Sequence, residues 1–349
     1  MKPSGNKLLL FIFLLIFMGG MFFINLVSGS VFIPFRDVLS VLSGAKSAVP
    51  DAYWTIVREF RLNQATTALL SGAGLAVAGL LMQTVFRNPL ADPSILGISS
   101  GASLGVALLL WVTTAAGGQA LLHYGFWGSV GISLAASFGA FSVLFIILFV
   151  SRRIGSMTSI LIIGLMISYI GGALTGLIKY YSNKDDIYTF VLWGMGSFSN
   201  VGSSMIPYLI VVVFLALLSA ILLIKPLNLL LLGERYAFAL GTNVQRNQWF
   251  ALLIGGFLTA IITAFSGPIA FIGLAVPHLA RNLFRTSDHR ILMPAVIIIG
   301  ASLALLCNWI ARLPGFDGSL PINAITSLIG APMVIWIIVS RKNLYRENV

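Results

Sequence analysis

Charged residues are scarce in this sequence. Asp, Glu, Lys and Arg make up only 9% of its 349 residues, whereas hydrophobic residues make up 58%. A soluble domain usually carries about 25% charged residues, so this chain has too little polar surface to coat a water-soluble globule. The composition therefore excludes an ordinary soluble protein and favours an all-α membrane protein with several spans.

Residues that could support catalysis or metal binding are also few. The single cysteine, Cys307, cannot form an internal disulfide, and the three histidines are scattered along the chain. No segment matches the phosphate-binding pattern G-x-x-x-x-G-K-[ST], so we expect no ATP bound by a P-loop. The chain is thus predicted to be no enzyme and to bind no metal or cofactor itself.

Long apolar runs are abundant instead. About 20 apolar residues cross a bilayer, and ten segments are predicted to do so: 8–27, 62–86, 96–115, 126–150, 158–180, 204–224, 248–266, 269–284, 291–311 and 321–340. The first run follows Lys2 and Lys7, as in a signal peptide. No clear cleavage site comes after it, so we interpret it as a retained helix.

The basic residues predict the orientation of these spans. Ten spans put both termini on one side, and cytoplasmic termini place 14 Lys and Arg residues in inner loops against 7 in outer loops. This excess follows the positive-inside rule. The net charge of +11 is therefore interpreted as a topology signal, and not as a basic face for nucleic acid.

Two outer segments are predicted to lie outside the spans. Residues 28–61 contain Pro34 and Pro50 and indicate a loop with a short amphipathic helix near 36–42. Residues 187–203 are moderately apolar but too short to cross, and they are predicted to form a short helix at the outer mouth.

The longest inner loop, 225–248, indicates a binding element. Its middle, Gly233–Gly241, can form a short helix that ends at Gly241, a residue typical of C-caps, and a second short helix could follow before Trp249. The apolar residues that could share one face are Leu232, Tyr236, Ala239 and Leu240. Such a face would bind either a partner protein or the lipid surface.

Two proline-broken segments complete the pattern. In 87–102 the two prolines preclude a continuous helix, Asp92 can cap the turn before the next span, and Gly97 and Gly101 permit close backbone approach. In 266–281 a Gly-Pro pair and Pro277 interrupt the helix, which is tolerated in a membrane only where protein or water covers the backbone. This favours a translocation path nearby, while His278 is more typical of a packing histidine.

Four long motifs resemble those of the FecCD family of ABC permeases, in the same order along the chain. They are QTVFRNPLADPSILGISSGASLG, GERYAFALG, GPIAFIGLAVPHLAR followed by DHR, and LPINAITSLIGAPMVIWII. The resemblance covers about residues 58–341 and implies that 1–349 form a single transmembrane permease domain with the type II importer fold. It also implies a homodimer in the bacterial inner membrane, two separate ATPase subunits that bind the ATP, and a periplasmic substrate-binding protein.

The resemblance also implies roles for particular residues. The coupling element seated in the ATPase would contain Glu234, Ala237, Leu240 and Gly241. Arginines that meet glutamates of the binding protein in the cobalamin branch match Arg61, Gln64 and Arg312. Gln64 lacks the charge, and the nearby Arg58 could compensate.

The transported substrate is predicted from the family and from the scarcity of charge. We expect an axial path with Met82 and Gln83 before the inner turn, and with Trp193 and Met195 at the mouth. Few charges in the spans suit a bulky, screened complex. An iron–siderophore complex is expected first, with cobalamin or haem as alternatives, and an ion-coupled secondary transporter is the alternative from a different class.

Overall fold

Helices make up the fold throughout the part of the chain that the computed structural model describes, residues 5–29, 31–46, 49–115, 125–313 and 319–346. Each predicted span contains one main helix. These are α1 (Gly5–Val27), α4 (Leu62–Val85), α5 (Ile98–Ala115), α7 (Gly125–Ser151), α8 (Met157–Tyr181), α10 (Ile206–Leu222), α13 (Val244–Ser266), α14 (Ile272–Phe284), α15 (His289–Ala311) and α16 (Ile322–Arg346). The all-α membrane prediction is confirmed.

The count of ten full crossings is only approximate. Seven helices in the described residues are long and apolar enough to cross a bilayer, or eight if α10 and α11 (Ile224–Leu231), which meet at 49°, form one broken span. The exceptions have simple causes: α14 has 13 residues, and the apolar part of α16 covers only Ile322–Trp336. A helix of 13 residues rises about 20 Å and is shorter than the hydrocarbon core.

The segment before α4 is more helical than the sequence indicated. The predicted short helix near 36–42 is present as α2 (Phe35–Leu42). Residues after it, however, form α3 (Asp51–Thr55) and a π-helical turn η2 (Ile56–Arg61), which continue directly into α4. The prediction of a loop up to residue 61 is therefore wrong for its last third, because the charged residues there extend the helix beyond its apolar part.

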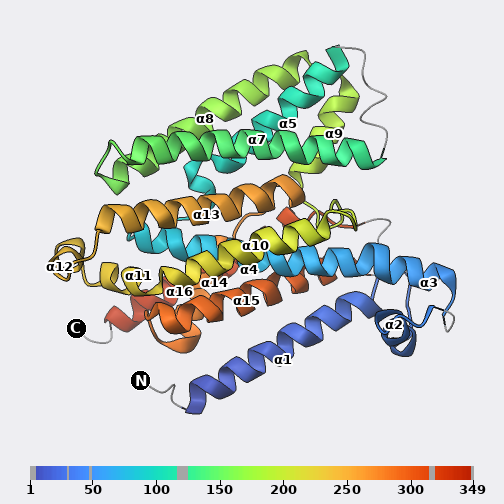
Figure 1. The fold of residues 1–349 in the computed structure, drawn as a ribbon, viewed down its shortest axis with the longest axis horizontal. Helices are drawn as coiled ribbons and strands as arrows, with labels where there is room; N and C mark the ends of the chain where they lie inside the picture. The colour runs from blue at the N-terminus through green and yellow to red at the C-terminus, as the bar shows by residue number, and fades with distance from the viewer. Residues whose placement is uncertain (1–4, 30, 47–48, 116–124, 314–318, 347–349) are drawn as a thin grey trace.

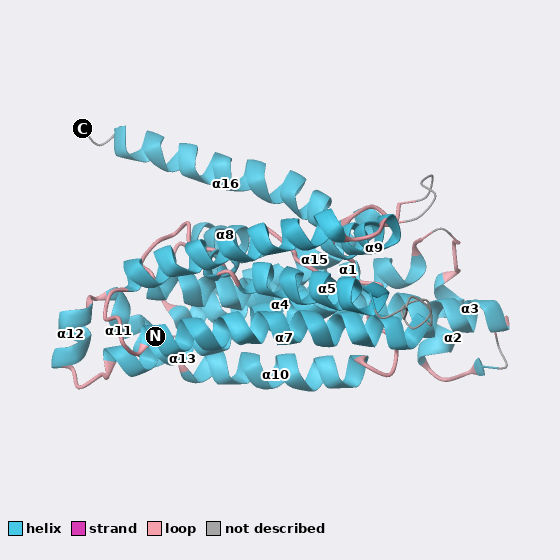
Figure 2. Ribbon diagram, turned by 90° about the horizontal axis from the view of Figure 1, so that it is seen from above, coloured by secondary structure: helices cyan, strands magenta, loops and turns pink. Residues whose placement is uncertain are grey.

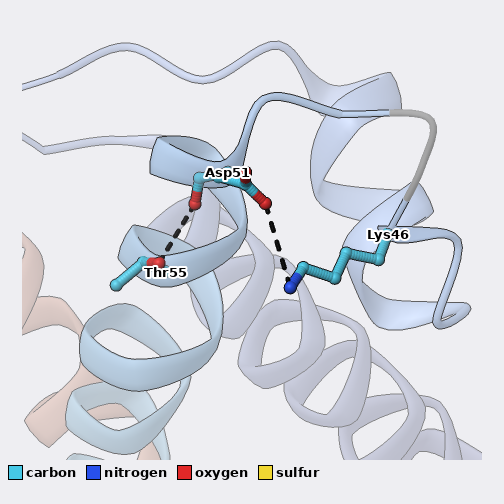
Figure 3. Close-up of polar contacts among 3 residues, drawn as sticks. All are labelled: Lys46, Asp51 and Thr55. Atoms are coloured by element: carbon cyan, nitrogen blue, oxygen red, sulfur yellow. Dashed lines mark hydrogen bonds and ion pairs between the residues drawn. The ribbon is translucent and has the colours of Figure 1, made fainter.

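The turn between α2 and α3 carries an exposed ion pair. Lys46 Nζ lies 3.9 Å from Asp51 Oδ1, and Thr55 Oγ1 donates to the backbone carbonyl of Asp51 at 3.0 Å (Figure 3). Both charged side chains are mostly exposed, so the pair contributes little to stability.

α4 is the central helix of the bundle. It packs against α10, α13, α14 and α15, and almost every residue from Asn63 to Val85 is buried (Figure 1). The closest contacts occur at glycines: a Cβ on Gly72 would lie 2.1 Å from the carbonyl oxygen of Gly300, and a Cβ on Gly79 would lie 1.8 Å from that of Gly273. Small residues thus permit the backbone contact that holds helices together in lipid.

A second group of helices packs along α13. In Figure 1, α5, α7 and α8 form a layer on one side of α13, and the short helix α9 (Lys184–Gly194), which follows α8, packs against α5. α9 overlaps the region 187–203 that was predicted as an outer short helix, but it begins three residues earlier and ends at Gly194. The expected close approach at Gly101 is confirmed, because a Cβ there would lie 2.5 Å from the Gly139 carbonyl oxygen.

The bundle has two distinct ends. α1 begins and α16 ends at the same end as α11 and α12 (Glu234–Ala239), which we call the α12 end. α2 and α3 lie at the opposite end, the α2 end (Figure 1). Seen from above, α16 and α8 lie along one long edge of the bundle and α10 along the other (Figure 2).

Candidate coupling, docking and pathway sites

A pair of short helices projects at the α12 end. α11 and α12 pack on each other, and Ala237 is fully buried between them. Five large apolar side chains of the same unit remain exposed: Leu231, Leu232, Tyr236, Phe238 and Leu240. An apolar surface at the polar end of a membrane bundle indicates a site for a partner protein. The predicted second short helix is misplaced: it precedes α12 as α11, and α13 begins directly at Val244.

Glu234 connects α12 to the transmembrane helices. Its Oε1 lies 3.5 Å from Arg87 Nη2, just beyond the end of α4, and accepts a hydrogen bond of 3.0 Å from Gln248 Nε2 on α13. Arg87 is held in the left-handed region, with φ of 47°, and this conformation ends α4. Glu234 thus contacts the end of α4 and the first turns of α13 at the same time.

Gly241 closes the unit. It adopts φ of +78°, and the backbone N–H groups of Gly241 and Thr242 donate to the carbonyls of Phe238 and Ala237 at 2.9 and 3.0 Å. This bonding satisfies carbonyls at the end of α12 and requires a left-handed residue, for which glycine is favoured. The residues predicted for coupling, Glu234, Ala237, Leu240 and Gly241, are thus brought together in one small element.

A polar network under α11 was not predicted from the sequence. Asn228 on α11 donates to Asp288 Oδ1 at 2.6 Å and accepts from the backbone N–H of His289 at 2.8 Å. The Nδ1 atom of His289 also lies 2.8 Å from Asn228 Oδ1, and its Nε2 lies 2.9 Å from Thr84 Oγ1 on α4. The network therefore links α11, α15 and the central helix. A single asparagine within an apolar run, and an Asp-His pair before a span, were the available signals.

Hydrogen bonding keeps the carboxyl group of this network ionised. The Arg290 backbone N–H, and then Asn228, donate to Asp288 and hold its pKa below the usual value. A lowered folded-state pKa means that the stabilising effect is present above the unfolded-state pKa and is lost as the pH falls through the folded one. The network is thus intact at neutral pH.

Asn228→Leu is expected to destabilise the chain by about 2 kcal/mol, because it leaves the buried His289 N–H and ring nitrogen without their partner. Chemical unfolding of the purified chain in detergent measures this effect. Asn282→Leu, at an exposed position on α14 at the same end, is the matched control and should change stability by less than about 0.5 kcal/mol. Equal losses in the two variants would contradict the assigned network.

Arg61 does not lie on the outer surface where the sequence placed it. Its side chain is 1% exposed, and Nη1 donates to the carbonyls of Leu26 and Val27 at 2.9 and 2.7 Å. Nη2 also donates to the Val31 carbonyl. The guanidinium thus neutralises the negative end of α1. Partners that are backbone carbonyls about 30 residues earlier leave no side-chain pattern in the sequence.

Arg312 lies beside Arg61. Both guanidinium groups flank Gly29, where a Cβ would lie 2.9 Å from Arg312 Nη2 and 3.0 Å from Arg61 Nη2. Arg312 Nη1 also lies 3.5 Å from the Asn25 carbonyl. Burial, and then the charge of Arg61, lower the pKa of Arg312 to about 10, so the group stays protonated at neutral pH.

The other two predicted docking residues are more accessible. Arg58 is exposed, with its guanidinium carbon 5.3 Å from the Trp54 ring centroid. Gln64 is half-buried on α4. Arg58 is therefore the accessible cation of the predicted set, while Arg61 and Arg312 hold the end of α1 in this conformation. The docking roles themselves stay predictions.

Arg61→Gln is expected to lower stability by about 2–3 kcal/mol, since it leaves buried carbonyls without a charged donor. Arg58→Gln, an identical substitution one turn earlier at an exposed position, should stay within about 0.5 kcal/mol of the parent. Thermal and chemical unfolding of the two purified variants checks this. A stable Arg61→Gln protein would mean that the guanidinium does not anchor α1.

Two of the four predicted pathway residues lie inside the chain. Met82 is fully buried against α13. A Cβ added to Gly255 would lie only 2.4 Å from the Met82 Cε atom. Gln83 is 3% exposed, donates to the Leu274 carbonyl at 3.2 Å and accepts from Arg281 at 2.5 Å. Neither therefore lines a surface in this conformation. Side chains near the end of a central helix face its neighbours, and the pathway role of these two residues stays a prediction.

The other two pathway residues belong to a junction near the α2 end. Trp193 is buried and Met195 is 40% exposed, at the end of α9. The backbone of Met195 accepts from Asn323 N at 3.1 Å, and Ser197 N donates to the Ser266 carbonyl at 2.8 Å. The end of α9, the break between α13 and α14, and the start of α16 are thus bonded together. Protein covers the broken backbone, as the membrane requires.

His278 is a buried, hydrogen-bonded packing residue, as the sequence favoured. It is 3% exposed, and Nε2 lies 2.7 Å from the Pro89 carbonyl oxygen. Asp92 caps the short 3₁₀ helix η3 (Pro93–Leu96) by accepting from Ser94 N at 2.9 Å, as predicted.

Comparisons with known proteins agree with this geometry. The FecCD transport family matches residues 13–340. The chain is 35% identical to the hemin transport system permease protein HmuU of Yersinia pestis, over 84% of this chain and 85% of that protein. It is also 35% identical to the vitamin B12 import system permease protein BtuC of Klebsiella pneumoniae, over 86% of this chain and 89% of that protein.

A solved structure extends the comparison to the fold. An inward-facing ABC transporter assigned to the metal-chelate type superposes with a TM-score of 0.79 at 30% identity, covering 95% of this chain and 99% of that one. PsaBC from Streptococcus pneumoniae, in complex with Fab, gives a TM-score of 0.53 at 15% identity and shares the fold alone.

Proposed function

Because the chain belongs to the FecCD transport family, we propose that it is the permease subunit that moves an iron–siderophore complex into the cytoplasm. The family makes it an ABC importer permease, a transport subunit whose ATPase is a separate protein. The observation that carries the choice of substrate is the 95% coverage by a metal-chelate-type transporter at 30% identity. Cobalamin or haem is the alternative, favoured by the two permeases at 35% identity.

The proposed path runs along the edge formed by α8, α9 and α16, against a second copy of the chain. α8 is the least buried of the long helices after α1, and it has no acidic or basic residue between Met157 and Ile178. It exposes apolar and aromatic side chains, among them Met166, Tyr169 and Leu174. An uncharged wall suits a large chelate whose own ligands screen the metal. α10 on the opposite edge would face lipid (Figure 2).

The proposed orientation places the α12 end in the cytoplasm. The excess of basic residues in the loops at that end supports it. Two ATPase subunits would then seat the exposed side chains of α12, and closure of the ATPase pair would move α4 and α13 through Glu234. A periplasmic binding protein would dock at the α2 end, where Arg58 offers an exposed cation.

Uptake in cells tests the substrate. The test strain lacks this gene and the genes of all other permeases of the family. It should not accumulate a ⁵⁵Fe-labelled siderophore, and restoring this gene should restore the accumulation. Labelled cobalamin and haemin, given in parallel, serve as controls and should accumulate equally in both strains. Restoration of cobalamin or haemin uptake alone would overturn the siderophore assignment but leave the importer assignment in place.

A further inference from the structure

A groove between α10 and α13 lies beside the coupling element, and the transport cycle described above assigns it no ligand. It has a volume of about 740 Å³. The lining residues that matter here are Leu222, Lys225, Arg246, Phe250, Leu253 and Ile254. The lining includes no acidic residue. From this chemistry we propose that the groove binds one anionic phospholipid, with the phosphate at Lys225 and Arg246 and an acyl chain along the apolar wall.

The two cations lie at the polar rim of the groove. Lys225 follows the end of α10, and Arg246 lies in the first turn of α13. Both are exposed, and neither forms an ion pair within the described residues. The guanidinium carbon of Arg246 lies 5.6 Å from the ring centroid of Phe250, which fixes its direction. A phosphate between two such cations is attracted by both.

Apolar side chains of both helices line the rest of the groove. Leu222 on α10 and Leu253 and Ile254 on α13 form its wall, beyond the cations. The wall continues into the exposed apolar face of α10, which includes Phe214, Leu215 and Leu218. α10 has 17 residues, nearly all of them apolar, and the acyl chain of the proposed lipid would lie against this exposed face. Charge at the rim and apolar surface below match the two parts of a phospholipid.

The position of the site adjoins the coupling element. Gly241 and Thr242, which close α12, line the same groove as Arg246. Asn243 caps α13 by accepting from the Arg246 backbone N–H at 2.9 Å. A bound lipid therefore contacts the segment that joins α12 to α13.

Native mass spectrometry of the delipidated permease–ATPase complex tests the proposal. Titration with phosphatidylglycerol should give a tight first adduct per permease chain, and phosphatidylcholine should bind at least tenfold more weakly. Lys225→Gln with Arg246→Gln should weaken the phosphatidylglycerol adduct by roughly thirtyfold, since each basic residue contributes roughly fivefold. Arg153→Gln with Arg290→Gln removes the same charge from exposed positions outside the groove and should leave the adduct unchanged.

Two further arms separate the possible occupants. Leu253→Trp fills the apolar wall without changing charge and should also remove the adduct. Glycerol 3-phosphate, which has the headgroup but no acyl chain, should neither bind tightly nor compete. Equal adducts in the groove and control variants would overturn the proposal. So would competition by glycerol 3-phosphate, which indicates a free-anion site, or loss of the ATPase with unchanged lipid binding, which assigns the groove to the partner protein.

Discussion

Gly241→Val is expected to abolish uptake and to weaken association with the ATPase about thirtyfold. Gly241 adopts φ of +78°, a region that costs an ordinary residue about 1–2 kcal/mol and a β-branched one more. The strain breaks the hydrogen bonds from Gly241 and Thr242 that end α12, so the exposed Phe238 and Leu240 no longer hold their relative positions. Copurification with the ATPase and uptake of labelled substrate measure the effect.

Gly202→Val provides the control for this prediction. Gly202 is exposed between α9 and α10, at the end of α10 away from α12, has no positive φ, and a Cβ there would meet nothing within 4 Å. The same substitution there should leave ATPase association and uptake within about twofold of the parent. Normal association and uptake by Gly241→Val would show that α12 is not the coupling element.

Gly72→Leu is expected to prevent assembly of a folded bundle. A Cβ at Gly72 would lie 2.1 Å from the Gly300 carbonyl oxygen and 2.6 Å from the Ala304 Cβ, so α4 and α15 must separate. Both helices are buried over most of their length, and overpacking of this size exceeds the usual 1–3 kcal/mol. The yield of monodisperse protein in detergent should fall by about tenfold or more.

Gly20→Leu is the matched control, since it adds the same side chain to a transmembrane helix. Gly20 lies on the exposed side of α1, and a Cβ there meets nothing within 4 Å. Its yield and unfolding temperature should equal those of the parent. A well-folded Gly72→Leu protein would contradict the assigned contact between α4 and α15.

The long helices could be predicted because apolar length is itself the signal for a span. The segment 51–61 was predicted wrongly because its charged residues, such as Arg58 and Glu59, resemble a loop when only composition is considered. α11 was missed for a related reason. Its apolar run lies within a loop where a second short helix was expected after Gly241 and not before Glu234.

The candidate sites were predictable where the signal is local. Gly241 and Glu234 belong to one contiguous motif, and the structure brings them together as expected. The contacts of Arg61 could not be predicted, because its partners are backbone carbonyls of α1 and the following turn. Backbone groups leave no pattern in a sequence. The Asn228 network joins residues about 60 and 205 positions apart, and such pairings require the fold.

The measurement that tests the account most directly is transport by the purified complex in proteoliposomes. The permease and its ATPase are reconstituted with the α12 end accessible to added ATP, and the binding protein is enclosed with a ⁵⁵Fe-labelled siderophore. The account predicts that the label leaves the binding-protein side only when ATP is hydrolysed, and that proton and sodium ionophores have no effect. Transport driven by an ion gradient without ATP would contradict it.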